Sequence, residues 1–525
     1  MTDHDTLAAL AAEGKISRRE FVARAAALGV GGSFFADAAL AQAKTPKKGG
    51  TLRVGMEGGS ASDSLDPRTY ADSVMIAASL ALMNGMVEIG PDGRATGELL
   101  ESWEAKPGAA EWVFNVRKGI KFASGKTLDA DDILYSISLH TGETKSPAKG
   151  LLKQIKEVKK LSPTQIQFTL DGGNADFPSV LSDYHLVIVP NGFTDWSKPD
   201  GTGAFTLEKF EPGVRIAFKA KGGYWKTGRG HFEAMEILYI QDKAARTAAL
   251  QSGKIDAANR LDARTVNLLA KDSKLNVVRT KGTGNRYCFV ARVNVAPFNN
   301  KDLRLALKYG VDRKKIIDTV FNGFASPGND HTLDAADPFY NKTMPQRAYD
   351  PDKAAFHFKK SGLGDTAIEL QTSEGAWSSA VDCASLYQEA LKKAKINLNV
   401  KKVSADGYWD NVWLKQPFCA VYWGRRPTAD VMLSTVFKSD SDWNDSAWKV
   451  PEFDKLVIAA RVELDEKKRL DLYGKAQEMI ADDGGMICFA ISDYLDGYTK
   501  KVMGNESHPR YDLADNRLGE KGWFV

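Results

Sequence analysis

The sequence predicts an α/β protein of two or three domains. Stretches in which apolar and polar residues alternate, such as GTLRVGM at 50–56, are typical of β-strands. Other stretches repeat apolar residues with the period of a helix, and the two kinds are interspersed along the whole chain. At 525 residues the chain is too long for one hydrophobic core, so at least two domains are expected.

The two periodicities place the individual elements. Strands are predicted at 50–56, 111–117, 165–170, 214–219, 236–240 and 397–403. Helices are predicted at 130–140, 242–252, 301–321, 350–361, 378–394, 452–462 and 465–482. Asp129 precedes the first of these helices and is a suitable N-cap. Within 271–300, a strand, a glycine turn and a second strand predict a crossing between two lobes, with the boundary near 280.

The composition argues against nucleic acid and anionic lipid as partners. Lys and Arg number 71 against 67 Asp and Glu, which gives a net charge of only +4, and no basic cluster is interleaved with aromatic residues. The spacing of the four cysteines fits neither a CxxC motif nor a compact disulfide framework. Whether they form disulfides stays open; they are Cys288, Cys383, Cys419 and Cys488.

The N-terminus has the features of an export signal. Arg18 and Arg19 precede a mildly apolar, alanine-rich stretch, and small residues up to Ala43 suit a signal peptidase. The stretch is too weakly apolar for a membrane anchor, which needs about 20 strongly apolar residues. Residues 1–43 therefore resemble a twin-arginine signal read by the Tat translocase of bacteria, and an amphipathic helix is the alternative. We expect the mature protein to be soluble and periplasmic.

The sequence contains no recognisable catalytic or cofactor-binding constellation. The stretch from Gly119 to Thr127 has five residues between its glycines, whereas a phosphate-binding loop needs four. The seven histidines show no metal-binding spacing, and no G-x-S-x-G motif is present. We therefore expect no enzyme activity, no metal and no cofactor.

Six stretches of the chain occur together in an order that is specific to one family. They are SLDPRTYAD at 64–72, FASGKTLDADDILYSI at 122–137, GTGAFTLEKFEPGVRIAFKAKGGYW at 201–225, PFNNKDLRLALKYGVDRKKIIDTVFNGFASPGN at 297–329, YDPDKAAFHFKKSGL at 349–363 and FDKLVIAARVELDEKKRLDLYGKAQEMIADDGG at 453–485. This set resembles the extracellular solute-binding proteins of the oligopeptide and dipeptide class, family 5, which deliver ligands to ABC importers. The resemblance spans nearly the whole mature chain.

The resemblance implies a two-lobed periplasmic binding protein fold, type II-like, with mixed β-sheets flanked by helices. An N-terminal lobe at 44–280 would carry an inserted subdomain at about 75–195, a C-terminal lobe would span 281–490, and residues 491–525 would return to the first lobe. A monomer would enclose a peptide-like or other small polar solute as a hinge closes, and deliver it to a membrane permease. The alternatives are an exported enzyme with a folded cofactor and a periplasmic chaperone or sensor.

Residues 421–430, VYWGRRPTAD, carry the main hypothesis about the ligand. In relatives that bind peptides with a free amino terminus, an aspartate shortly after the matching tryptophan holds the ligand's ammonium. Here Trp423 and Gly424 are followed by Arg425 and Arg426, and a guanidinium pairs with carboxylate or phosphate. An arginine in the cleft would favour an anionic ligand, and strand alternation allows at most one to enter. The alternative is that both pair with acids of the other lobe or lie at the rim.

Six further residues are candidates for the ligand-binding wall. The resemblance brings the glycine-rich first loop and the start of one helix close to the ligand, and the region 408–448 is unusually aromatic. Its rings could stack on a sugar or an aliphatic ligand, although a buried aromatic core is the more common cause of such a pattern. The candidates are Ser60, Ser62, Asp63, Trp377, Tyr408 and Trp443.

Overall fold

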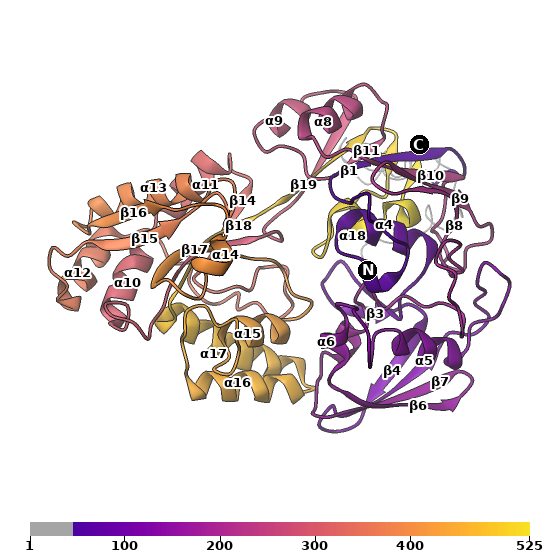
Figure 1. Cartoon of the computed structure of the whole chain (residues 1–525), viewed down its shortest axis with the longest axis horizontal. Coiled ribbons are helices and arrows are strands. Elements are labelled where there is room, and N and C mark those ends of the chain that lie inside the picture. Colours follow the sequence, from indigo (N-terminus) through magenta and orange to yellow (C-terminus); the bar gives the residue numbers. More distant parts are fainter. Residues whose placement is uncertain (1–45) are drawn as a thin grey trace, which may run out of the picture.

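The structure is a computed structural model that describes residues 46–525 and consists of two lobes (Figure 1). The export signal predicted at 1–43, with Arg18, Arg19 and Ala43, lies outside the described residues. Mixed β-sheets flanked by helices build both lobes, so the predicted α/β fold class is confirmed. Within residues 46–525, every helix is too short or too polar to span a bilayer.

The N-terminal lobe is built on a seven-stranded sheet with the order β12-β19-β11-β1-β10-β9-β8. The alternation in the first predicted strand buries Leu52, Val54 and Met56, and helix α4 is buried along its whole length against the same core. The strands of this sheet are β1 (Thr51–Met56), β8 (Phe205–Glu211), β9 (Arg215–Ala220), β10 (Ala234–Tyr239), β11 (Ala257–Ala258), β12 (Leu275–Thr280) and β19 (Tyr494–Thr499). The helical segments are η1 (Pro67–Thr69), α4 (Ser73–Leu82), α8 (Lys243–Gln251) and α9 (Val266–Leu269).

A four-stranded antiparallel sheet, ordered β4-β5-β7-β6, forms a separate core beside this lobe. Rings of Phe114, Phe168 and Phe177 meet edge to face in its centre. The predicted cap is confirmed, because the Asp129 carboxylate accepts hydrogen bonds from the first backbone N–H groups of α5. The elements are β2 (Val87–Ile89), β3 (Ala95–Gly97), β4 (Leu100–Ala105), β5 (Glu111–Val116), β6 (Ile155–Ser162), β7 (Gln165–Leu170), α5 (Ala130–Ser138), α6 (Lys149–Leu152) and α7 (Phe177–Val180).

The C-terminal lobe is built on a six-stranded sheet with the order β14-β18-β13-β17-β15-β16. The helical pattern at 301–321 forms two helices and not one, because the chain breaks at Gly310 and Asp312 caps a new helix. The strands are β13 (Arg286–Ala291), β14 (Ala325–Pro327), β15 (Ile368–Thr372), β16 (Leu398–Lys402), β17 (Phe418–Trp423) and β18 (Met486–Ser492). The helices are α10 (Lys301–Tyr309), α11 (Arg313–Val320), α12 (Pro351–Ser361), α13 (Ala380–Lys392), α14 (Tyr408–Asn411), α15 (Ala429–Phe437), α16 (Pro451–Val462) and α17 (Glu466–Asp483).

The chain crosses between the two large sheets at residues 281–285 and again at Asp493. The two crossings lie against each other: the buried Asp493 carboxylate accepts a hydrogen bond from the Gly282 N–H at 2.7 Å and pairs with Arg279. A Cβ at Gly284 would lie only 2.8 Å from the Ser492 carbonyl oxygen, so this close approach requires glycine. The lobe boundaries near 280 and 490 stay predictions, which these crossings support.

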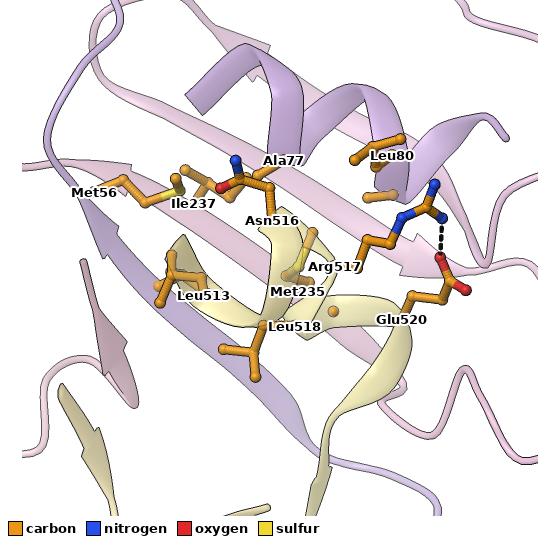
Figure 2. A pocket seen from close by; sticks show the side chains of 13 residues that line it. Met56, Ala77, Leu80, Met235, Ile237, Leu513, Asn516, Arg517, Leu518 and Glu520 are labelled. Carbon is orange, nitrogen blue, oxygen red and sulfur yellow. Dashed lines mark hydrogen bonds and ion pairs between the residues drawn. The ribbon is translucent and has the colours of Figure 1, made fainter. Parts of the chain in front are cut away.

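The last part of the chain returns to the N-terminal lobe. Figure 2 shows Leu513 and Leu518 packed beside β1 and β10 under α4, around a cavity of about 20 Å³ that is far too small for a solute. The Arg517 guanidinium pairs with Glu520 at 2.9 Å in the same view. The returning elements are β20 (Val502–Met503), α18 (Asp512–Asn516), α19 (Leu518–Lys521) and β21 (Trp523–Phe524).

A buried charge cluster joins the returning segment to the subdomain. The Lys226 ammonium lies 2.9 Å from Glu88, 2.5 Å from Glu98 and 2.9 Å from Glu520, and Arg517 pairs with Glu98 at 2.8 Å. Burial alone would raise the pKa of Glu520, but Lys226 and Arg517 outweigh it and lower that pKa to about 2. The Glu520 carboxylate is therefore ionised at neutral pH, and the cluster holds three parts of the chain together.

The four cysteines are all buried and unpaired with one another. Cys288 and Cys488 are direct partners across β13 and β18. Burial raises the pKa of the Cys383 thiol to about 12, so this thiol is protonated at neutral pH. The sequence left open whether the cysteines form disulfides. In the structure they are free thiols that pack as small apolar groups.

We expect Glu520→Gln to lower the free energy of unfolding by about 3 kcal/mol at pH 7, because it leaves buried cations short of a counter-charge. The pKa of Glu520 in the folded protein lies below its ordinary value of 4.5, so its stabilising contribution is complete above pH 4.5 and is lost as the pH falls toward 2. Urea unfolding between pH 7 and pH 3 should show a difference between the two proteins that shrinks with acid.

Glu389→Gln is the matched control, because Glu389 is 62% exposed and pairs only with Lys392 one helical turn away. This change should leave stability nearly unchanged at every pH. An E520Q protein as stable as the control at pH 7 would contradict the role of the cluster.

Candidate functional site

A cavity of about 1170 Å³ lies between the two lobes beside the crossings. The N-terminal lobe contributes Glu57 and Arg260, which follow β1 and β11, and the C-terminal lobe contributes Asn285, Tyr287 and Trp377. Binding sites for small molecules commonly have volumes of about 300–1000 Å³, so this space can admit a solute of that size. The cavity therefore lies at the junction of the two lobes, next to the segments through which the chain crosses between them.

Trp377 lies on the wall of this cavity, just before helix α13. Its ring packs on Tyr287 with 5.0 Å between centroids. Its buried indole N–H has no hydrogen-bond partner within residues 46–525. Trp377 therefore lines the interlobe cavity, and its contact with a ligand stays a prediction.

The candidates in the first loop bond to their own neighbours. The Asp63 carboxylate accepts hydrogen bonds from the Tyr239 hydroxyl and the Ser60 N–H, each at 3.0 Å. The Ser60 and Ser62 hydroxyls lie 2.7 Å apart. The residue of this region that lines the cavity is Glu57, at the start of the loop.

Two candidates of the aromatic region belong to the core. Tyr408 is 1% exposed, and its hydroxyl donates to the Ala420 carbonyl at 2.8 Å, so it has no surface to offer a ligand. Trp423 is likewise buried, and its indole N–H donates to the Asp445 carboxylate at 3.1 Å. Trp443 differs from both, because it is 47% exposed.

Arg425 is occupied by partners within the protein. Its guanidinium lies 3.2 Å from the Asp334 carboxylate and donates to the Pro509 carbonyl of the returning segment at 2.8 Å. The same Asp334 also pairs with the buried Arg286. Arg425 therefore links the two lobes.

Arg426 has no carboxylate partner within the described chain, and one of its N–H groups donates to the Gly424 carbonyl at 3.4 Å. Its guanidinium lies over the rings of Trp423 and Trp443, 5.7 and 5.9 Å from their centroids. Burial and the positive charge of Arg286 together lower the pKa of Arg426 below its ordinary value. The side chain lines a small interlobe cavity of about 70 Å³, so a charged group without a carboxylate partner in residues 46–525 faces the space between the lobes.

Several residues that define this site carry no recognisable signal in the sequence. Strand register brings Arg286 opposite Trp423 and Tyr287 opposite Tyr422, although more than a hundred residues separate them in the chain. The Asp445 carboxylate accepts a hydrogen bond from the indole N–H of Trp423. Had the pairing of β13 with β17 been known, Arg286, Tyr287 and Tyr422 could have been placed beside the candidate Trp423. The pattern of a single strand does not show which strand it pairs with.

Comparison with known proteins decides the family. The model of the bacterial extracellular solute-binding proteins, family 5 Middle, matches residues 94–445. The chain belongs to this family. This family-5 chain is 27% identical over 493 residues to a dipeptide-binding protein of Pseudomonas aeruginosa, covering 85% of this chain and 90% of the relative.

Solved structures share the fold of this family-5 protein. The periplasmic binding protein DppA from Helicobacter pylori, in complex with the peptide STSA, is 22% identical and covers 91% of this chain and 98% of its own, with a TM-score of 0.71. The unliganded open form of the murein tripeptide binding protein MppA is 18% identical, with the same coverage and a TM-score of 0.79. The two-lobed binding protein fold predicted from the sequence is confirmed.

The family assignment also fixes the class of function. Its members are solute-binding proteins, so this chain is a periplasmic solute-binding protein of the peptide ABC importer class and not an enzyme. The alternative of an exported enzyme with a folded cofactor is thereby set aside. The residues between the lobes therefore have to bind a ligand, and not to make or break its covalent bonds.

Arg425→Ala and Arg426→Ala should differ in their effect on stability. Loss of Arg425 breaks a partly buried ion pair and a contact between the lobes, and is expected to lower the free energy of unfolding by about 2 kcal/mol. Loss of Arg426 removes a desolvated charge without a carboxylate, and should leave stability within about 0.5 kcal/mol of wild type or raise it. Chemical denaturation of both variants measures this, and equal losses would contradict the assignment.

Proposed function

We propose that this protein captures a small peptide-like solute with an anionic group between its lobes and delivers it to an ABC permease. The observation that carries the proposal is Arg426, a guanidinium in the interlobe space with no carboxylate partner in the described chain. A carboxylate or phosphate of the ligand would complete its coordination. Blocked or acidic peptides, opine-like conjugates and sugar acids all provide such a group.

The surrounding charges favour an anion. Arg286, Arg425 and Arg426 lie close to one another, and Asp334 pairs with the first two. Asp430 is the next acid in the sequence, but it is buried and pairs with Arg461 at 3.0 Å. A ligand ammonium placed here would meet unbalanced positive charge, whereas an anion would neutralise it.

Capture would follow from closure of the lobes about the two crossings. In the present arrangement the cavity is larger than a small solute needs, and it is open to solvent. Groups from both lobes line it, so a ligand that contacts both stabilises the closed state by its differential affinity. Trp377, Glu57 and Arg260 line this cavity, whereas Arg426 lines the smaller interlobe cavity, and closure would bring both sets of groups toward one ligand.

We expect Arg426→Ala to weaken binding of an acidic solute by about 30-fold or more, because a charge-assisted hydrogen bond in a desolvated site is lost. Native mass spectrometry identifies a co-purified ligand, and titration calorimetry with blocked acidic dipeptides, free-amine dipeptides, opines and sugar acids measures the affinities. Arg215→Ala is the matched control, since Arg215 is 38% exposed on β9, pairs with Glu211 and lines neither interlobe cavity.

The proposal fails if free-amine dipeptides bind tightly and their affinity is the same in wild type, Arg426→Ala and Arg425→Ala. It also fails if no solute of the panel binds to the wild-type protein and none co-purifies. Both conclusions require that the control variant binds acidic solutes with the same affinity as the wild-type protein.

We further propose that the Tat translocase exports the protein and that it works as a monomer. Arg18 and Arg19 ahead of a mildly apolar stretch support this route. Replacement of both by lysine should leave the precursor in the cytoplasm, as cell fractionation would show. Export of the doubly substituted precursor at the normal rate would contradict the route without affecting the binding proposal.

A further inference from the structure

Three aromatic side chains in the region around β17 are exposed, although other aromatic side chains of the same region are buried. Trp409 is 36% exposed, Tyr422 37% and Trp443 47%, whereas Tyr408 and Trp423 belong to the core. They come from α14, from β17 and from the loop after α15. Packing therefore accounts for the buried members of this region but not for the exposed ones.

The three exposed rings and the half-buried Trp413 form a connected series, which we call the aromatic belt: Tyr422, Trp409, Trp413 and Trp443. Adjacent rings meet edge to face, with centroids 5.4 Å apart for Tyr422 and Trp409, and 5.7 Å apart for Trp409 and Trp413 and for Trp413 and Trp443. Such contacts fix the rings relative to one another. Because the outer members remain partly in water, ring surface stays available for a further ring.

The belt lies beside residues that line the two interlobe cavities. At one end, Tyr422 is the direct strand partner of Tyr287, which lines the large cavity and packs on Trp377. At the other end, the Arg426 guanidinium lies over Trp443. A solute held by Arg426 would thus have aromatic surface beside its anionic group.

A buried carboxylate fixes the orientation of the belt. One oxygen of Asp445 accepts hydrogen bonds from the indole N–H groups of Trp413 at 3.3 Å and of Trp423 at 3.1 Å. Its other oxygen has no partner within residues 46–525, and no cation pairs with it there. A carboxylate in this setting is costly for folding. Its contacts are with the rings, so we regard Asp445 as a positioning residue for them.

From this arrangement we propose that the solute is an acid that also carries a planar aromatic ring, with the anionic group on Arg426 and the ring on Trp443 and its neighbours in the belt. The inference rests on the proposed function and narrows its ligand class. A planar ring of the ligand can stack on the exposed rings of the belt. The adjacent Arg426 guanidinium can pair with the anionic group of the ligand.

The test compares two acidic probes that differ only in the ring, N-acetyl-Phe-Asp and N-acetyl-Ala-Asp, by titration calorimetry on the full chain. We expect the aromatic probe to bind about ten-fold more tightly. Trp443→Ala should abolish this preference and leave the affinity for the alanine probe unchanged, whereas Arg426→Ala should weaken both. Phe356→Ala is the control, because Phe356 is exposed on α12 in the outer part of the C-terminal lobe.

Asp445 is tested by a readout that separates orientation from general stability. Asp445→Leu should reduce the ring preference and the near-ultraviolet circular dichroism of the coupled tryptophans. Asp445→Asn, which keeps an oxygen acceptor, should restore much of both. A spectrum unchanged in the leucine variant would overturn the positioning role.

The outcomes distinguish this inference from the proposed function. Equal affinities of the two probes, or equal losses for both in Trp443→Ala, overturn the aromatic subsite while Arg426-dependent binding of acids leaves the proposed function intact. Absence of any binding, or binding that does not depend on Arg426, overturns both.

Discussion

The pairing of Asp334 with two guanidinium groups determines how charge is distributed between the lobes. Arg286 reaches this carboxylate from β13 and Arg425 from the end of β17, and Arg425 also bonds the carbonyl of Pro509 in the other lobe. One buried anion thus anchors a strand end, a loop and an interlobe contact. Asp334 already pairs with these two guanidinium groups. The neighbouring Arg426 therefore has no carboxylate partner within residues 46–525.

The elements of the fold could be predicted from local sequence because each depends on its own periodicity. Strands such as β1 and β7 and helices such as α12 and α16 lie within a residue or two of the expected ranges. The stretch 301–321 was wrong as one helix, because a glycine and a capping aspartate interrupt a pattern whose apolar period continues on either side. Periodicity shows which face is buried but not where the chain bends.

The site could be predicted only in part, because its chemistry depends on long-range pairing. The sequence located the two arginines, but the difference between them comes from Asp334, some ninety residues earlier. Tyr408 and Trp409 are adjacent and equally aromatic, yet the first is buried and the second exposed. The polar atoms of Asp63 and Ser60 satisfy one another locally. Composition cannot separate a side chain that packs from one that remains available.

The position of β19 in the N-terminal lobe bears on the order of biosynthesis. This strand, residues 494–499, lies between β12 and β11, so β12 joins the rest of the sheet only through it. The N-terminal lobe therefore cannot complete its sheet until residues 494–499 have been synthesised, after all six strands of the C-terminal lobe. The order of synthesis thus lets the C-terminal lobe complete its sheet first, although the N-terminal lobe begins earlier in the chain.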